Sequence, residues 1–183
     1  MNNLFIVGSS IQTRNAPLTY SPVRTIFSSE ERFRQTIFTV NSIQAAFPEA
    51  KIVVVDSSDI YKEYQDTFRF FKNTEFIPLK ELDQEAFEIV NTHPNKSLCE
   101  SLLLNTFYKK FRKEIKQYDY VIKTCGRYFY FHLNDALFNV ENLNKLFFAT
   151  LSKSTAFSGS SPSILLVNNE IDPYIDVNGV LSS

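Results

Sequence analysis

Hydrophobic and polar positions in the first third of the chain are arranged in a way that predicts a strand, a helix and a second strand. An apolar run at 4–7 ends in glycine and serine, as a buried strand followed by a tight loop does. From 28 to 47, apolar residues recur at helical spacing, and Ser28 with Glu31 has the spacing of a capping box. A β-branched run follows at 51–55. This order predicts a βαβ unit with parallel strands.

The rest of the chain continues to alternate between strands and helices. Helical spacing predicts helices near 60–72, 82–90, 97–116 and 143–150, and short apolar runs predict strands at 76–78, 120–122, 129–133, 156–157 and 164–167. We therefore expect a single α/β domain over residues 1–183, with a mostly parallel central sheet flanked by helices. The polar segment 168–183 has neither pattern, which is typical of a flexible tail or of a fragment of a longer polypeptide.

Composition narrows the class of protein. With 44% hydrophobic and 21% charged residues, the chain resembles ordinary soluble globular proteins, and its net charge of −1 gives no basic field that would attract nucleic acid. Cys99 and Cys125 fall in helix-like and strand-like segments, which favours reduced thiols over a disulfide. The start of the chain lacks the features of a signal peptide, and no apolar run approaches the roughly 20 residues that cross a bilayer. These features predict a cytoplasmic protein without a transmembrane segment.

The most informative stretch surrounds the predicted strand at 120–122. Lys123 follows directly, and Gly126 would let the backbone turn sharply before Arg127. Ligands bind at the carboxyl ends of the strands in open α/β sheets, and an arginine with a nearby lysine suits phosphate or carboxylate. The pair therefore predicts a site for a phosphate-bearing ligand. Two surface cations extended over apolar neighbours, with Gly126 as a simple hairpin turn, would produce the same pattern.

The run Lys123-Thr124-Cys125-Gly126-Arg127-Tyr128 resembles the Lys-x-x-Gly-Arg-Tyr motif of a group of bacterial and viral sugar-transferring proteins related to GT-A fold glycosyltransferases. Stretches at 30–36, 39–48 and 95–100 are similar to the same group in the same order, so the resemblance covers roughly residues 4–135. It implies a Rossmann-like GT-A nucleotide-binding domain. The implied activity is transfer of a sugar from a nucleotide-diphosphate donor to a glycan acceptor, as in the synthesis of surface polysaccharides.

The resemblance also implies roles for individual residues. Lys123, Gly126 and Arg127 would hold the diphosphate of the donor, and Tyr128 would border or stack on it. Arg127 would in addition stabilise the negative charge that develops on the leaving nucleoside diphosphate during catalysis.

Three more residues are candidates for donor binding: Ser9 and Asp56, which follow predicted strands, and Arg14, which lies with Arg24 in the long irregular loop after the first strand. The Asp56 carboxylate offers acceptors for a ribose or a base. An equally good interpretation is that Asp56 caps the next helix, and Arg14 also fits a solvated arginine in the long loop after the first strand.

The expected metal-binding motif is missing. GT-A glycosyltransferases usually carry an Asp-x-Asp pair that holds a divalent cation against the donor's diphosphate, because hard cations need oxygen ligands. This chain contains no Asp-x-Asp, which leaves dependence on manganese or magnesium open and suggests that Lys123 and Arg127 replace the cation. Asp135 is the best remaining carboxylate for a metal or for a general base that activates an acceptor hydroxyl. The pair Asn134-Asp135 is also typical of a simple turn.

The start of the predicted helix at 97–116 is a second place for an anion. Ser97 and Glu100 have the spacing of a capping box, and Lys96 precedes them. Free amide groups at a helix N-terminus hold anions, so a phosphate fits there, whereas the cap already accounts for Glu100. The basic residues near the other end of this helix fit a solvated end that complements the helix dipole.

Two other functions stay open alongside sugar transfer. A transferase domain that has lost turnover would bind a nucleotide sugar or a partner, and the missing carboxylate pair favours this alternative. The aromatic run 128–131 also has a likeness to the base-stacking strand of RNA-recognition domains, which the number of helices and the charge disfavour. No particular oligomeric state is indicated.

Overall fold

The chain folds around one sheet. A computed structural model describes residues 2–59, 62–129, 147–149 and 164–168. Their strands form a six-stranded sheet in the order β3-β2-β1-β4-β6-β5. Four neighbouring strands are parallel and two are antiparallel: β1 (Asn3–Ser9), β2 (Lys51–Asp56), β3 (Thr74–Pro78) and β4 (Tyr120–Cys125) against β6 (Ile164–Asn168) and β5 (Phe147–Ala149). The predicted mostly parallel sheet is confirmed.

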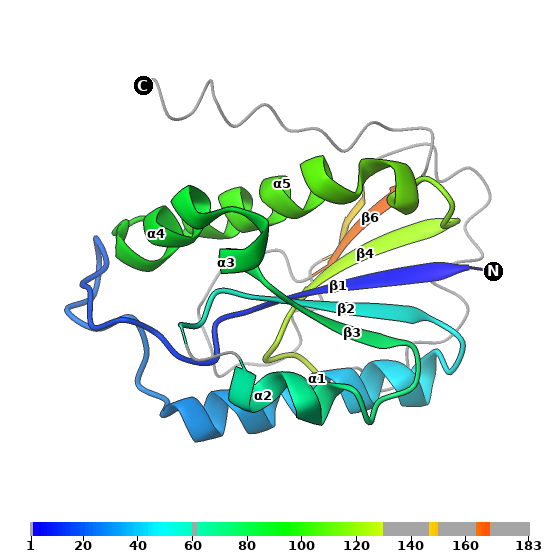
Figure 1. Cartoon of the computed structure of the whole chain (residues 1–183), viewed down its shortest axis with the longest axis horizontal. Helices are drawn as coiled ribbons and strands as arrows, with labels where there is room; N and C mark the ends of the chain where they lie inside the picture. The colour runs from blue at the N-terminus through cyan, green and yellow to red at the C-terminus, as the bar shows by residue number, and fades with distance from the viewer. Residues whose placement is uncertain (1, 60–61, 130–146, 150–163, 169–183) are drawn as a thin grey trace.

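Helices cover both faces of the parallel strands (Figure 1). On one side lie α1 (Ser29–Ala46) and α2 (Lys62–Phe68), and on the other lie α3 (Leu79–Leu82), α4 (Gln84–Thr92) and α5 (Lys96–Ile115). Successive residues of β1 therefore point into two different cores: Phe5 packs with the α1 layer and Ile6 with the α5 layer. Burial of each such side chain stabilises the fold by about 1.5–3 kcal/mol. This two-sided burial explains why the strands read as continuous apolar runs.

The two longest helices begin differently from one another. At α1 the predicted capping box is present, because Ser28 Oγ accepts from the Glu31 amide at 3.2 Å and the Glu31 carboxylate accepts from the Ser28 amide at 2.8 Å. At α5 the predicted cap is wrong. Asn95 is the N-cap, and its side chain accepts from the Leu98 amide at 3.2 Å. Asparagine caps as well as serine, and the earlier start releases the Glu100 side chain for another contact.

Two of the predicted helices differ in the structure. The helix expected over 82–90 is divided at Asp83, whose carboxylate caps α4 by accepting from the Ala86 amide at 2.9 Å. The helix expected over 143–150 is wrong at 147–149, where β5 pairs with β6. Short apolar runs fit either element, and here hydrogen bonds to a neighbouring strand determine the outcome. Residues 130–133 of the expected fifth strand, the strand at 156–157 and the tail after 168 lie outside the described residues.

Helix α5 ends in a basic cluster that is exposed, as predicted: Lys109, Lys110, Arg112 and Lys113. Cys99 in α5 and Cys125 at the end of β4 are both free thiols, as the sequence indicated. Within the ranges that the structure describes, no helix is both long enough and apolar enough to cross a membrane.

The end of β4 lies unusually close to α1, and Gly126 makes this possible. Its amide donates to the Gly8 carbonyl at 3.0 Å, and its carbonyl accepts from the Thr36 hydroxyl at 3.3 Å. A Cβ atom on this residue would lie 2.8 Å from Thr36 Oγ1. The backbone of Gly126 does not have a positive φ. The backbone turns at Gly126 and Arg127, as the sequence predicted, and the Tyr128 amide donates to the Cys125 carbonyl at 3.2 Å. The glycine itself is required by the close approach of the helix and not by a backbone conformation that only glycine adopts.

We predict that Gly126→Ala lowers the free energy of unfolding by about 1–3 kcal/mol, because the new methyl group displaces a stiff, hydrogen-bonded threonine. Urea denaturation measures the change. Gly8→Ala is the matched control, since a Cβ there meets its nearest atoms at 3.7 and 4.0 Å, which is ordinary contact. The double variant Gly126→Ala with Thr36→Ala should cost less than the sum of the single changes. Additive losses would contradict the explanation.

Candidate functional site

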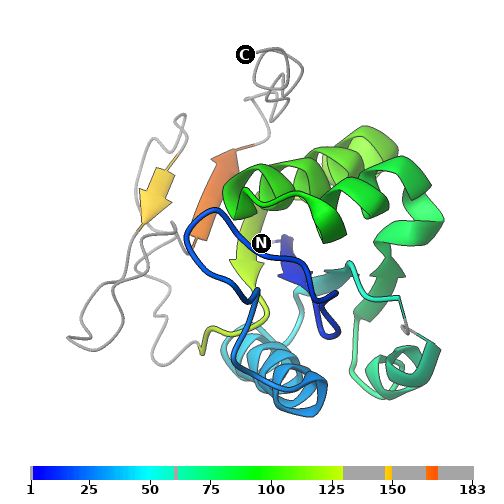
Figure 2. The ribbon, with the colours of Figure 1, turned by 90° about the vertical axis from the view of Figure 1, so that its left-hand side faces the viewer.

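The carboxyl ends of β1 and β4 form the point at which the sheet changes direction. From β1 the chain crosses to β2 through α1 on one face of the sheet, whereas β4 is reached through α5 on the opposite face. Open α/β sheets bind ligands in the crevice at this kind of switch point. Figure 2 faces the edge at which the parallel strands end, with the loop after β1 passing across it.

Three cations meet at this edge: Arg32 in the first turns of α1, Lys96 at the first position of α5, and Arg127 just after β4. Among the described residues, none of the three forms an ion pair with a carboxylate. Arg32 donates from Nε to the Ser10 carbonyl and from Nη1 to the Thr25 hydroxyl at 3.1 Å, and both partners are neutral. Within the described part of the chain, none of the three positive charges is therefore neutralised by a direct acidic partner.

The pKa values of Arg32 and Lys96 are lowered, first by burial and then by neighbouring positive charge. Burial, and after it the charge of Arg127, lower the pKa of Arg32 to about 10, although Cys125 and Asp56 act in the opposite direction. Lys96 reaches water, yet partial loss of hydration lowers its pKa, and Arg127 and then Arg32 add to this effect while Glu100 opposes it. A group whose charged form is disfavoured in this way is stabilised by any anion that binds beside it.

Lys123, the first cation predicted for the site, is used differently. It lies inside β4 with a side chain that is only 8% exposed, and its ammonium donates to the Glu100 carboxylate of α5. Val121, two residues earlier on the same strand face, packs in the core between the sheet and α5. The charge of Lys123 is thus neutralised by an ion pair that joins the sheet to α5. Lys123 is therefore not available to bind a ligand together with Arg127.

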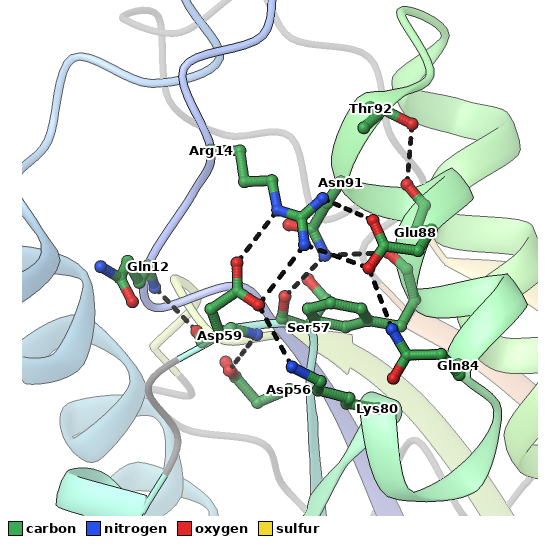
Figure 3. A network of polar contacts seen from close by, with 12 residues as sticks. Gln12, Arg14, Asp56, Ser57, Asp59, Lys80, Gln84, Glu88, Asn91 and Thr92 are labelled. Atoms are coloured by element: carbon green, nitrogen blue, oxygen red, sulfur yellow. Dashed lines mark hydrogen bonds and ion pairs between the residues drawn. The ribbon is translucent and has the colours of Figure 1, made fainter.

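Arg14 is also paired with acidic residues of the protein (Figure 3). Its guanidinium contacts Glu88 of α4 at 2.6 Å and Asp59 at 3.0 Å, and it lies 5.2 Å from the centroid of the Phe87 ring. Hydrogen bonds from Arg14 lower the pKa of both carboxyl groups and in turn raise the pKa of Arg14. Lys80 approaches the other oxygen of Asp59 at 3.7 Å. Arg14 therefore fastens the loop after β1 to α4, and its charge is already satisfied.

Asp56 and Ser9 have positions that support the loops. Asp56 is fully buried, and its carboxylate accepts from the Ile11 amide at 3.0 Å and the Ser58 amide at 2.7 Å. It therefore fixes the loops after β1 and β2, and neither of these contacts caps α2, which begins at Lys62. Ser9 is buried as well, and its hydroxyl lies 3.2 Å from the Thr36 hydroxyl.

The remaining predicted residues lie at the border of the described chain. Tyr128 is partly buried directly after Arg127, and its amide donates to the Cys125 carbonyl at 3.2 Å. Asp135 lies outside the described residues. In the part of the chain that the structure describes, no group of three or more His, Cys, Asp or Glu residues is placed to hold a metal ion.

Sequence reasoning missed Arg32, and it considered Lys96 only as part of a helix start. Arg32 stands one helical turn before Thr36 in a helix that begins at the carboxyl edge of the sheet, so its position follows from the βαβ unit. No local motif separates it from Arg34 two residues later, which is 69% exposed and pairs with Glu30 within the helix. Only the packing of α1 on the sheet distinguishes the two arginines.

We predict that Lys123→Met lowers the free energy of unfolding by about 1–3 kcal/mol, which is less than for a fully buried pair because Glu100 retains 30% exposure. Chemical denaturation measures the loss, and adding Glu100→Gln should restore part of it. Lys72→Met is the matched control, since the Lys72–Glu49 pair is exposed and should contribute little. An unchanged stability together with lost affinity for pyrophosphate would instead make Lys123 a direct ligand.

Comparisons with known proteins do not assign a function to the chain. No protein-family model matches the chain, and no curated protein matches its sequence. What the molecule does must therefore be inferred from the cations at the edge of its sheet.

Proposed function

We propose that the chain is a glycosyltransferase that binds a nucleotide-diphosphate sugar at this edge of the sheet and transfers the sugar to a glycan acceptor. One observation carries the proposal: Arg32, Lys96 and Arg127 converge at the switch point without carboxylate partners among the described residues. By contrast, Arg14 and Lys123 are both paired with acids. Charges kept unpaired at a ligand-binding position favour an anionic substrate.

A diphosphate suits this cluster better than a single carboxylate does. Two arginines offer planar sets of donors for phosphate oxygens, and the lysine adds a compact charge. Helices α1 and α5 both begin at this edge, so the positive ends of their dipoles add to the field. The same groups would stabilise the charge that develops on the leaving nucleoside diphosphate.

The sugar-transfer part of the proposal is supported by the resemblance of 123–128 to the Lys-x-x-Gly-Arg-Tyr motif. The geometry changes the roles within that motif. Arg127 keeps its proposed contact with the diphosphate, Lys96 takes the place proposed for Lys123, and Tyr128 stays beside the donor. Asp56 would shape the nucleoside pocket through the loops that it fixes, because its carboxylate is fully buried. Asp135 stays the proposed general base.

The alternative functions differ in what they require of the same surface. A binding domain without turnover would use the same three cations, so only a transfer or hydrolysis assay separates it from an enzyme. An RNA-recognition domain stacks bases on the aromatic residues of its sheet. Here helices cover both faces of β1 to β4, and this arrangement disfavours base stacking on those strands.

We predict that Arg127→Ala weakens binding of inorganic pyrophosphate and of nucleoside diphosphates by roughly 10- to 100-fold, the loss expected for a charge-assisted hydrogen bond. The melting temperature should stay nearly unchanged, because the described contacts of the Arg127 side chain hold no other element. Titration calorimetry at low salt measures affinity for pyrophosphate and for the diphosphates of uridine, guanosine, adenosine and cytidine. Arg69→Ala, at an exposed arginine paired with Asp66, is the matched control. Equal affinity in wild type and Arg127→Ala would overturn the site.

We also predict that donor hydrolysis or transfer persists in excess chelator, because protein cations supply the charge that a metal would otherwise bring. Release of nucleoside diphosphate from a labelled nucleotide sugar measures the activity. Complete loss with chelator that manganese restores would show that a divalent cation is required. Tight diphosphate binding without any turnover would favour the non-catalytic domain.

A further inference from the structure

One hydroxyl group lies between the backbones that carry the two arginines of the cluster. Thr36, on α1, is 2% exposed. Its Oγ1 lies 2.9 Å from the Arg32 carbonyl oxygen and 3.3 Å from the Gly126 carbonyl oxygen, and it is 3.2 Å from Ser9 Oγ. The threonine hydroxyl has one proton to donate and two lone pairs, and either hydroxyl can be the donor in the contact with Ser9.

These contacts connect the two arginines through short, stiff paths. Arg32 is one helical turn before Thr36, and the hydroxyl bonds to its own carbonyl. The Gly126 carbonyl belongs to the peptide group that continues into Arg127. Threonine has few rotamers in a helix, and glycine allows the closest possible approach. The separation of the two backbone segments that carry Arg32 and Arg127 is therefore set largely at this one hydroxyl.

The contact between Thr36 and the two carbonyl groups matters because like charges repel one another. Two cations in a partly buried environment raise each other's energy, so they move apart unless the backbone that carries them is fixed. A diphosphate gains most when its two phosphoryl groups meet donors that are already at the right spacing. A looser contact between α1 and the end of β4 would let the arginines separate before the ligand arrives.

We propose that Thr36 is a positioning residue whose hydroxyl sets the spacing of Arg32 and Arg127 for a diphosphate. This inference rests on the proposed function, because it assigns a role within that same anion site. The hydroxyl itself does not touch the ligand. It acts through the carbonyl groups next to the two arginines.

Two substitutions at Thr36 separate positioning from packing. Thr36→Val keeps the shape of the side chain and removes the hydroxyl, whereas Thr36→Ser keeps the hydroxyl and removes the methyl group. Both should lower the melting temperature, because the site is buried. Only Thr36→Val should weaken binding of inorganic pyrophosphate, by about five-fold in titration calorimetry, as expected for one lost hydrogen bond. Thr36→Ser should bind within about two-fold of wild type.

Thr39 supplies a matched control on the same helix. It is fully buried, and its hydroxyl donates to the Gln35 carbonyl at 3.0 Å, as the Thr36 hydroxyl donates to Arg32. Thr39→Val therefore removes a similar bond, and it should leave pyrophosphate affinity unchanged.

The outcomes distinguish the two proposals. If wild type does not bind pyrophosphate, the anion site and the role of Thr36 both fail. If wild type binds and Thr36→Val binds equally well, only the positioning role fails. Equal losses in Thr36→Val and Thr36→Ser, or a similar loss in Thr39→Val, would attribute the effect to packing of α1 and would also overturn the role. A variant that does not fold is replaced by Thr36→Ala, which should lose affinity as Thr36→Val does.

Discussion

The close approach of α1 to the end of β4 is the constraint on which the rest of this structure depends. Where Gly126 meets Thr36 there is no room for a side chain, so the helix and the strand are joined through backbone carbonyls and one hydroxyl. This contact fixes the first turns of α1 relative to the strand end. On the other face of the sheet, the ion pair between Glu100 and Lys123 does the same for α5. Both helix starts are thus held against β4, and each presents a cation one turn before its contact.

Charge in this protein is divided between two uses. Arg14, Arg24 and Lys123 hold parts of the fold together: Arg14 and Lys123 pair with acids, and Arg24 donates to the Val90 and His93 carbonyls at the end of α4 at 3.2 and 2.6 Å. Arg32 and Arg127 have no acidic partner among the described residues. Both sets contain arginines, so residue type does not distinguish them. They differ in the groups to which their side chains bond. The net charge of −1 conceals this local excess, so global charge says nothing about the site.

Periodicity predicted the parallel strands and α1 because two-sided burial and a capping box leave clear local signals. It failed at 147–149, where pairing with the next described strand along the chain decides the conformation. For the site, the sequence indicated the sheet edge at which Arg127 lies, yet it paired Arg127 with Lys123 and did not consider Arg32. The side of the strand on which Lys123 emerges, and the presence of Glu100 across from it, depend on how α5 packs. The position of Lys123 three residues before Gly126 in the sequence does not indicate how α5 packs on the strand.

The loop that follows β1 is attached to α4 at several separate points. Arg14 bonds to Glu88, Arg24 bonds to two carbonyls, and the Thr19 amide donates to the Pro94 carbonyl at 3.1 Å. A segment of this length would otherwise sample many conformations and would lose that freedom when a substrate arrived. Because contacts within the protein already order this loop, a ligand that binds at this edge would meet a preorganised surface. The loop loses its conformational entropy when the protein folds and not when a ligand binds. Slow amide exchange along this segment in the ligand-free protein would report that order directly.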